Sequence, residues 1–525
     1  MGAALVADAL IDRAIKATGL DRFDSDSYRE GLDILLADAN QAGLSDSGHA
    51  RMEANVVDLL SNRLRTTDYL AQRPELLERP VERPVFVFGI PRTGTTLLSN
   101  LLACDPARRS PLTWEIDEPV PPATSATLKS DPRAIARLEQ EKAMLAARPE
   151  MGKYYRNSAV YPNECIFFMA HDFKALALES RGKLPNYRDW LFSTDMTSAY
   201  DYHKRFLQLL QADAPGVWNL KMPSHSLWIE TIRKIYPDAR FIWTHRDPYT
   251  AMGSFCSIIS LGQMAFTGRV DPEWLAENCT YQAKLHADRI MDARERLGED
   301  SMVDVHYADL TSDPIGTMRR LYAALGDDFT PQAEAAMQAW LDDNPQGKFG
   351  RHDYKLAQYG LSVEQLAPHF ERYLARYDNA YVTRNVDKAV AQFRDRADVR
   401  TLSEIEVPVQ LWTPQGEGQG VQKLAFVWVD DMQFELIQPI SGDVLALYRD
   451  ALPADDRLVF HHICNRVDDW AAFMARVEDQ PYPVVLKGGT PGMLEFVYLD
   501  TREWLGHYVE YVWMGPDRWR GMGGL

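Results

Sequence analysis

Apolar residues recur at helical spacing through the first part of the chain, separated by charged and small polar side chains. The polar clusters DSDS (24–27) and SDS (45–47) are typical of helix N-caps, because Ser and Asp side chains accept hydrogen bonds from free backbone N–H groups. The pattern ends at the proline-rich stretch RPELLERPVERP (73–84), since proline cannot continue a helix. We therefore expect a helical N-terminal region over residues 1–82.

From Val85 to about Tyr377, short apolar runs alternate with segments of helical pattern. Buried strands separated by helix-length segments are typical of a parallel sheet covered by helices. This pattern predicts an α/β core over residues 83–377. The runs that predict strands are VFVFG (85–89), GVWNLK (216–221), ARFIWTHR (239–246) and MVDVHY (302–307).

The pattern changes after Tyr377 and then repeats. YVTRNVDKAVAQF predicts a strand and a helix, and VQKLAFVWVDDMQFELIQP predicts two adjacent strands. LVFHHICNRVDDWAAFMARV again predicts a strand and a helix, and MLEFVYLDTREWLGHYVEYVW two more strands. We therefore expect a duplicated β-α-β-β-β unit, and an α+β domain over residues 378–525.

Composition narrows the class of protein. The chain has 525 residues, enough for two or more domains, and a formal net charge of −18, which disfavours nucleic acid as a partner. Its five cysteines form no C-x-x-C pair, and the N-terminus interrupts its apolar residues with charges, unlike a secretory leader. No run approaches the ~18 apolar residues of a membrane span. We expect a cytoplasmic protein with reduced thiols.

The stretch VFVFGIPRTGTTLL (85–98) has the outline of a phosphate-binding loop between a strand and a helix. Gly89 and Gly94 have the spacing of the nucleotide-triphosphate loop, but Thr95 stands where that loop has lysine. Backbone N–H groups at a helix start bind anions, and an arginine fork can bind a phosphate or sulfonate. The expected anion contacts are Arg92, Thr93, Gly94, Thr95 and Thr96.

A second stretch, YPDARFIWTHRDPYTAMGSF (236–255), predicts a strand that ends at THRDP and a helix that carries Ser254. The carboxyl ends of parallel strands line the ligand crevice of α/β sheets. Arg246 and Ser254 are therefore well placed to bind a second phosphate. A surface pair of Arg246 with Asp247 would explain only part of this pattern.

Together, the two stretches resemble the bacterial branch of the sulfotransferases that use 3'-phosphoadenosine 5'-phosphosulfate (PAPS), over residues 1–377. The resemblance implies a P-loop-like α/β fold and a product, adenosine 3',5'-bisphosphate (PAP). It implies that PRTGTT holds the 5'-phosphosulfate, and that Arg246 and Ser254 hold the 3'-phosphate. GKFGRHDYKLAQYGLS (347–362) looks like the family's late nucleotide-covering loop. Its implied contacts are Lys348, Arg351 and His352.

Sulfonyl transfer needs a base for the acceptor hydroxyl and a cation near the departing oxygen. Glu115, after the loop helix, and His225, in LKMPSHSLW, are alternative bases. Each residue has an equally weighted structural alternative. Glu115 would pair with a nearby arginine, and His225 would cap a helix. The cation is Arg92 or Lys221.

The acceptor is expected to be a small, fairly apolar hydroxylated molecule such as a phenol, a steroid-like alcohol or a lipid. Aromatic residues are dense in the segment that precedes residue 174, which suggests a hydrophobic acceptor pocket. Glu164 and His171 in YPNECIFFMAHDF are further candidates for its lining. A tightly packed aromatic core accounts for the same density.

The duplicated unit resembles the vicinal oxygen chelate, or glyoxalase-like, superfamily in FELIQPISG, HHICNRVDD and YLDTREWLGHYVEY. The family's metal positions fall on Asp378, Glu435, His462 and Glu510, with Asp378 where histidine is usual. Such a set binds a divalent metal, although buried carboxylates can also be paired for structural reasons. The alternatives for this domain are a metal-dependent glyoxalase or dioxygenase activity, or a ligand-binding or dimerisation role that makes the chain a homodimer.

Overall fold

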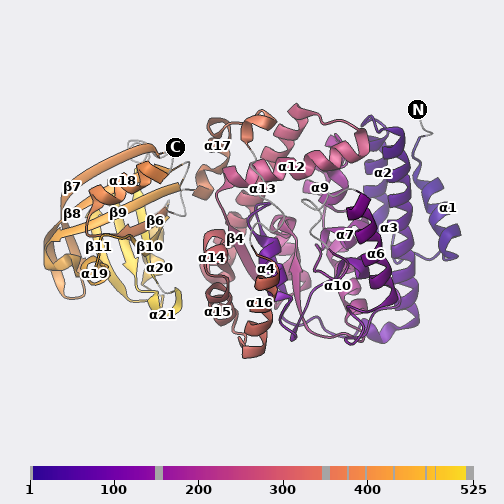
Figure 1. Cartoon of the computed structure of the whole chain (residues 1–525), viewed down its shortest axis with the longest axis horizontal. Coiled ribbons are helices and arrows are strands. Elements are labelled where there is room, and N and C mark those ends of the chain that lie inside the picture. Colours follow the sequence, from indigo (N-terminus) through magenta and orange to yellow (C-terminus); the bar gives the residue numbers. More distant parts are fainter. Residues whose placement is uncertain are drawn as a thin grey trace. The chain divides into compact units, whose positions relative to one another are not determined.

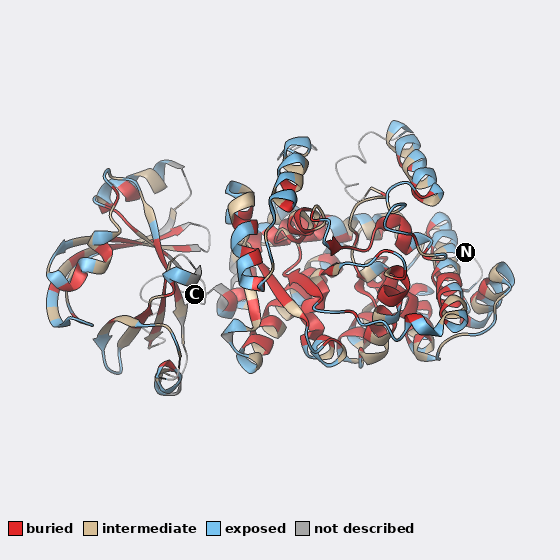
Figure 2. Ribbon diagram, turned by 90° about the horizontal axis from the view of Figure 1, so that it is seen from below, coloured by how far each residue is buried: buried red, intermediate tan, exposed pale blue. Residues whose placement is uncertain are grey.

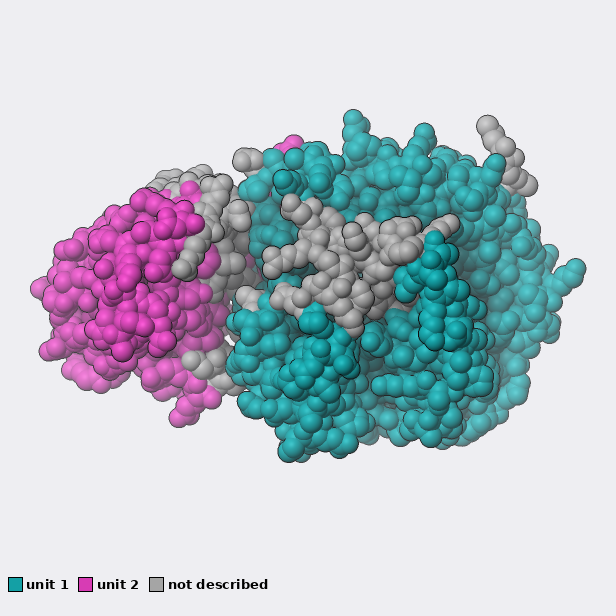
Figure 3. All heavy atoms as spheres, in the orientation of Figure 1, with its two compact units in different colours: residues 1–363 teal, residues 364–525 magenta. Residues whose placement is uncertain are grey.

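We analysed a computed structural model of the chain, which divides into two compact units, residues 1–363 and 364–525 (Figure 3). The predicted domain boundaries, after residues 82 and 377, stay predictions. The structure describes residues 4–147, 158–345, 355–374, 378–396, 399–429, 432–467, 470–478, 480–505 and 507–515.

Three helices form the N-terminal region: α1 (Ala7–Thr18), α2 (Ser27–Ala39) and α3 (Asp46–Gln72) (Figure 1). Ser45 caps α3, since its side chain accepts a hydrogen bond from the backbone N–H of Gly48. The fully buried Arg63 of α3 forms an ion pair of 2.8 Å with Asp172. Because a buried charge pair is costly to break, this contact fixes α3 against the body of the unit.

A five-stranded parallel sheet lies at the centre of the first unit, with strand order β2-β3-β1-β4-β5. Four of its strands confirm the predicted runs. β2 was not predicted, because its two arginines lack the apolar character of a buried strand. The strands are β1 (Val85–Gly89), β2 (Arg108–Arg109), β3 (Val217–Lys221), β4 (Arg240–His245) and β5 (Met302–His306).

Helices cover both faces of this sheet, as a parallel sheet requires. Side chains of β1 and β4 that point to one face, such as Val87 and Ile242, pack with apolar residues of α4 (Thr95–Leu102) and α15 (Pro314–Leu325). On the other face, Phe86 contacts the rings of His203 and His225. Buried residues therefore concentrate at the centre of the unit (Figure 2).

The remaining helices of the first unit surround this core. They are α5 (Thr113–Asp117), α6 (Pro132–Ala147), α7 (Ile166–Met169), α8 (Leu176–Glu179), α9 (Pro185–Ser193), α10 (Thr197–Leu210), α11 (Ile229–Ile235), α12 (Pro248–Thr267), α13 (Pro272–Leu297), α14 (Tyr307–Ser312) and α16 (Pro331–Asp343), with short 3-10 helices η1 (Pro74–Leu76), η3 (Ala170–Asp172), η4 (Pro223–Trp228), η5 (Glu299–Ser301) and η6 (Leu356–Tyr359). Among the residues that the structure describes, no helix has both the length and the apolar character of a membrane span.

The second unit contains a closed barrel of order β10-β13-β12-β11-β7-β8-β9-β6. Its chain order is β6-α18-β7-β8-β9 followed by β10-α20-β11-β12-β13, which confirms the predicted duplication. The elements are α17 (Val363–Leu374), β6 (Asp378–Val382), α18 (Val386–Arg396), β7 (Val399–Thr413), β8 (Gly416–Val429), β9 (Met432–Ser441), η7 (Asp443–Leu445), α19 (Ala446–Asp450), β10 (Val459–Arg466), α20 (Trp470–Val477), β11 (Val484–Thr490), β12 (Leu494–Leu499), α21 (Arg502–Leu505) and β13 (Tyr508–Met514).

Candidate functional site

The loop between β1 and α4 has the backbone that an anion site needs. Gly94 caps α4 with a φ of 101°, and Arg92 also has a positive φ, of 77°. A Cβ on Gly94 would lie 2.7 Å from the ring of Tyr307, so both the conformation and the space exclude other residues there. The Thr93 hydroxyl donates to the carbonyl of Ile90 at 2.8 Å. Thr93 therefore shapes the loop, while Thr96 is only half-buried.

The end of β4 brings its polar residues to the same loop. Arg246 donates from Nη1 to the carbonyl oxygen of Arg92 at 3.1 Å, and its guanidinium lies over the ring of Tyr307 at 4.3 Å. Arg92 donates from Nε to Ser254 Oγ on α12 at 2.9 Å. Asp247 caps α12 by accepting from the N–H of Thr250 at 2.7 Å. The structure therefore brings Arg92, Arg246 and Ser254 together, as the two sequence stretches predict.

Lys221 reaches the loop from the end of the neighbouring strand β3. Its Nζ lies 2.6 Å from a carboxylate oxygen of Glu164 and donates to Thr96 Oγ1 at 3.5 Å. The Lys221 side chain is 3% exposed and that of Glu164 26% exposed. A carboxylate and an ammonium group thus meet beside the anion loop, and only the carboxylate has appreciable access to solvent.

Sequence reasoning placed Glu164 in the acceptor pocket and did not connect it with Lys221. The two residues are separated by 57 positions along the chain, so no local spacing reveals the pair. The backbone N–H of Cys165 donates to the carbonyl of Lys221 at 3.1 Å, and this contact sets the two segments side by side. Only tertiary structure supplies that contact.

Glu115 lies in the interior and is fully buried. One of its oxygens accepts from Arg109, and the other accepts from the backbone N–H of Leu112 at 3.1 Å. The guanidinium of Arg109 lies over the Trp218 ring at 4.9 Å. The pairing of Glu115 with a nearby arginine, one of the two readings open from the sequence, is thus observed.

His225 is also fully buried, beneath the sheet. Its Nδ1 lies 2.9 Å from the hydroxyl of Tyr200, and its ring packs edge-on against Phe86. Burial lowers the pKa of His225 well below its ordinary value. His171, the other histidine considered, is buried beside Tyr202, and burial lowers its pKa to about 3. Both imidazoles are therefore neutral at pH 7.

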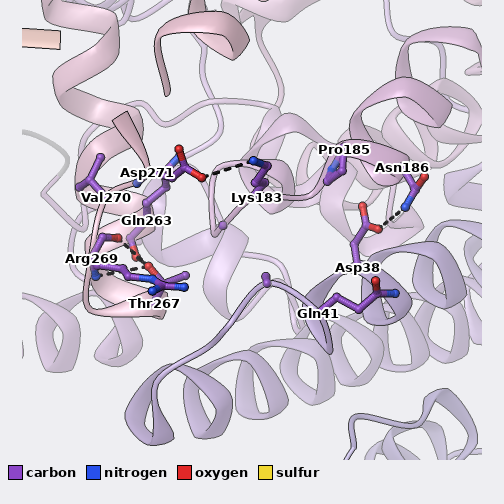
Figure 4. A pocket seen from close by; sticks show the side chains of 12 residues that line it. Asp38, Gln41, Lys183, Pro185, Asn186, Gln263, Thr267, Arg269, Val270 and Asp271 are labelled. Atoms are coloured by element: carbon purple, nitrogen blue, oxygen red, sulfur yellow. Dashed lines mark hydrogen bonds and ion pairs between the residues drawn. The ribbon is translucent and has the colours of Figure 1, made fainter. Parts of the chain in front are cut away.

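The predicted covering-loop contacts Lys348, Arg351 and His352 lie outside the described residues. A pocket of about 480 Å³ is lined by Gln263 and Thr267, near the C-terminal end of α12, and its lining does not include Ser254 (Figure 4). Within it, Lys183 forms an ion pair of 3.4 Å with Asp271, and Asn186 donates to Asp38 at 2.7 Å. Its lining includes none of the residues of the loop between β1 and α4.

In the second unit, Glu435, His462 and Glu510 come together from β9, β10 and β13, with their ligand atoms within 4.8 Å of one another. His462 Nε2 lies 3.7 Å from Glu435 and 3.1 Å from Glu510. Asp378, the fourth predicted ligand, pairs in register with Cys464 of β10, and its side chain lies outside the described part.

The charges of this cluster suit a cation. Burial alone would lower the pKa of His462, but hydrogen bonds with Glu435 and Glu510 raise it to about 9. His461 Nδ1 lies 2.9 Å from His462 Nδ1, and the Tyr498 hydroxyl lies 3.0 Å from His462 Nε2. Two carboxylates and one imidazole fit a divalent metal such as Mn²⁺, Fe²⁺ or Zn²⁺.

The two units match two different protein families. Residues 379–497 match the Glyoxalase/Bleomycin resistance protein/Dioxygenase superfamily. Residues 84–331 match the sulfotransferase family. The resemblances drawn from the sequence to a sulfotransferase and to a glyoxalase-like domain are both confirmed.

The first unit is similar to several mycobacterial sulfotransferases. The chain is 27% identical over 310 residues to omega-hydroxy-beta-dihydromenaquinone-9 sulfotransferase Stf3 of Mycobacterium bovis. The aligned region covers 56% of this chain and 74% of that protein. The crystal structure of sulfotransferase STF9 from Mycobacterium avium is 41% identical, covers 70% of this chain and 96% of its own, and has a TM-score of 0.67. The crystal structure of sulfotransferase STF1 from Mycobacterium tuberculosis is 31% identical, covers 70% of this chain and 98% of its own, and has a TM-score of 0.63. With this fold, this loop and these relatives, the chain belongs to the sulfotransferase family, whose sulfonate donor is PAPS.

Proposed function

We propose that the first unit transfers a sulfonate from PAPS to a hydroxyl of a small, fairly apolar molecule. The loop residues Arg92 to Thr96 would hold the 5'-phosphosulfate with backbone N–H groups at the start of α4. Arg246 and Ser254 would hold the 3'-phosphate, which needs a guanidinium and a hydroxyl donor. Their joint contacts with Arg92 support this assignment.

The pair of Lys221 and Glu164 beside Thr96 is the observation that carries the chemical part of the proposal. Arg92 Nε donates to Ser254, on the side proposed for the 3'-phosphate. Lys221, the other cation considered, contacts Thr96 at the start of α4. We therefore assign Lys221 to the bridging oxygen and Glu164 to the acceptor.

In this mechanism, the Glu164 carboxylate accepts the proton of the acceptor hydroxyl as the acceptor oxygen forms a bond to sulfur. The bond between sulfur and the bridging oxygen of the 5'-phosphate breaks, and that oxygen keeps the electron pair. The Lys221 ammonium and the N–H groups of the loop stabilise the new negative charge. The products are a sulfate ester and PAP, and Glu164 then loses its proton to water.

The surroundings of Glu164 support an apolar acceptor. Phe167, three residues further along, is 42% exposed although it is large and apolar. The Mycobacterium bovis relative acts on omega-hydroxy-beta-dihydromenaquinone-9, which carries a hydroxyl group. A hydroxyl on a fairly apolar molecule is the acceptor class that both observations favour.

The test is a screen of hydroxylated metabolites with labelled PAPS, repeated with Glu164→Gln and Lys221→Met. General bases contribute roughly 10²–10⁴-fold, so Glu164→Gln should lose that much turnover while PAP still binds. Glu118→Gln is the matched control, because Glu118 is an exposed glutamate outside the pair of Lys221 and Glu164. Wild-type turnover in Glu164→Gln would refute its role. Failure of the wild-type protein to bind PAP would refute the whole proposal.

The convergence of Glu435, His462 and Glu510 favours a second function, divalent metal binding in the second unit. A bound metal would supply a Lewis acid for an oxygen-bearing ligand. Metal analysis of the wild-type chain and of His462→Ala tests this, and equal metal content would remove the site. If the site is removed, sedimentation of the full chain decides whether the unit serves dimerisation.

A further inference from the structure

A second group of potential metal ligands is buried beneath the sheet of the first unit. Cys165 directly precedes α7, His203 belongs to α10 and His225 to η4. One ligand atom from each lies within 4.8 Å of the others. All three side chains are fully buried in the first unit, and none of them belongs to the loop between β1 and α4.

The two imidazoles are each held from behind by a tyrosine. His203 Nδ1 lies 2.7 Å from the hydroxyl of Tyr236, and His225 Nδ1 lies 2.9 Å from that of Tyr200. These contacts leave Nε2 as the nitrogen available to a ligand. Both Nε2 atoms are buried and have no hydrogen-bond partner in the described part of the chain. Buried polar atoms are rarely left in that state, so each points to a missing partner.

The protonation states match those of metal ligands. Burial lowers the pKa of His203 to about 3 and that of His225 well below its ordinary value, so both rings are neutral and keep a lone pair. Burial raises the pKa of the Cys165 thiol, which keeps it uncharged without a cation. A metal ion reverses this, because a coordinating thiol loses its proton.

We propose that Cys165, His203 and His225 bind a thiophilic closed-shell cation, Zn²⁺ or Cu⁺. One thiolate and two imidazoles are a ligand set that both ions accept. Binding forms one bond to sulfur and two to Nε2, and releases the Cys165 thiol proton to solvent. Tyr200 and Tyr236 are the outer partners that orient metal-bound histidines.

The site lies directly behind the pair proposed for sulfonyl transfer. Cys165 is the residue after Glu164, and its backbone N–H donates to the carbonyl of Lys221 at 3.1 Å. A metal on Cys165 and His225 would join the segments that carry Glu164 and Lys221. The role is therefore to position those segments, and the ion itself does not touch the reacting groups.

The experiment uses the full chain with His462→Ala, which removes the cluster of the second unit from the metal count. Stripped protein is titrated with Zn²⁺, and separately with Cu⁺ under reducing conditions, and bound metal is measured by mass spectrometry. We expect one equivalent of the preferred ion. X-ray absorption should show one sulfur and two imidazole nitrogens around it.

Variants then assign the ligands. Cys165→Ser should weaken binding at least 100-fold, and Tyr200→Phe roughly 10–100-fold, because loss of an outer partner has an effect of that size. Cys256→Ser is the matched control, since Cys256 is equally buried but lies outside the cluster, and it should bind as the parent does. Unchanged affinity in Cys165→Ser, or no binding by the parent chain, would overturn the proposal. If Cys165→Ser fails to fold, the X-ray absorption spectrum of the parent chain decides, and a spectrum without a sulfur ligand would overturn the proposal.

Discussion

Glu179, at the end of α8, gives the most quantitative prediction. Its side chain is 1% exposed and accepts hydrogen bonds from Asn278 at 2.8 Å and from Gln282 at 3.0 Å, both on α13. Burial raises the pKa of Glu179 from 4.5 to about 7, although the two amide donors and Arg188 act against it. The folded state therefore favours the protonated carboxyl.

The shift fixes both the sign and the size of the effect. A raised carboxyl pKa gives stability that is fully present below about pH 4.5 and is lost as the pH rises through about 7. At 1.36 kcal/mol per pKa unit, the charged carboxylate costs about 3 kcal/mol at pH 8 relative to the protonated form. Glu179→Gln carries no charge, so this pH dependence should disappear.

The measurement is urea unfolding of wild type and Glu179→Gln at pH 5, 6, 7 and 8. We expect the variant to gain about 2.5 kcal/mol on wild type between pH 5 and pH 8, because a small part of the effect is already present at pH 5. Glu78→Gln, at an exposed position, is the control and should show no such gain. A difference between Glu179→Gln and wild type that stays constant across the range would refute the reasoning, since Glu179 would then be in one state throughout.

Three further predictions concern the proposed sites. Arg246→Ala should weaken PAP binding about 10–100-fold in calorimetry, the value of a hydrogen bond to a charged group, and equal affinity would contradict the 3'-phosphate assignment. Glu115→Gln should lower the free energy of unfolding by about 3 kcal/mol, because it leaves Arg109 buried and unpaired, with PAP affinity unchanged. Lost turnover at full stability would instead make Glu115 the base. His461→Ala should weaken metal binding by the second unit only about 10–100-fold, against a near-complete loss in His462→Ala, because His461 orients His462. If His461→Ala and His462→Ala lose metal affinity equally, both histidines are metal ligands.

The fold was predictable where apolar runs mark buried strands. β1, β3, β4 and β5 all carry such runs. Of the two predicted cap clusters, SDS supplies the cap of α3 through Ser45, whereas Asp26 of DSDS stands at the N-cap of α2 without a side-chain capping hydrogen bond. β7 (Val399–Thr413) and β11 (Val484–Thr490) were not located individually. β7 has many exposed side chains, and β11 contains two glycines that weaken any strand signal.

The candidate site also has a part that the sequence predicts and a part that it does not. Arg92, Arg246 and Ser254 stand in contiguous motifs whose chemistry can be read locally. The contact of Glu164 with Lys221 depends on how α7 is set against β3, which no spacing along the chain encodes. The burial of Glu115 and His225 is likewise a property of packing, since their sequence neighbourhoods resemble those of residues that face a cleft.

The hydrogen bond from Arg246 to the carbonyl of Arg92 has a consequence for turnover. On the proposed assignment, the group that holds the 3'-phosphate also holds the backbone around the 5'-phosphate. Both phosphates survive the reaction, and only the sulfonate leaves. The spent donor would thus keep nearly every contact of the fresh one. Because PAP and PAPS would share these contacts, we expect PAP to inhibit the enzyme and to leave slowly after rapid chemistry.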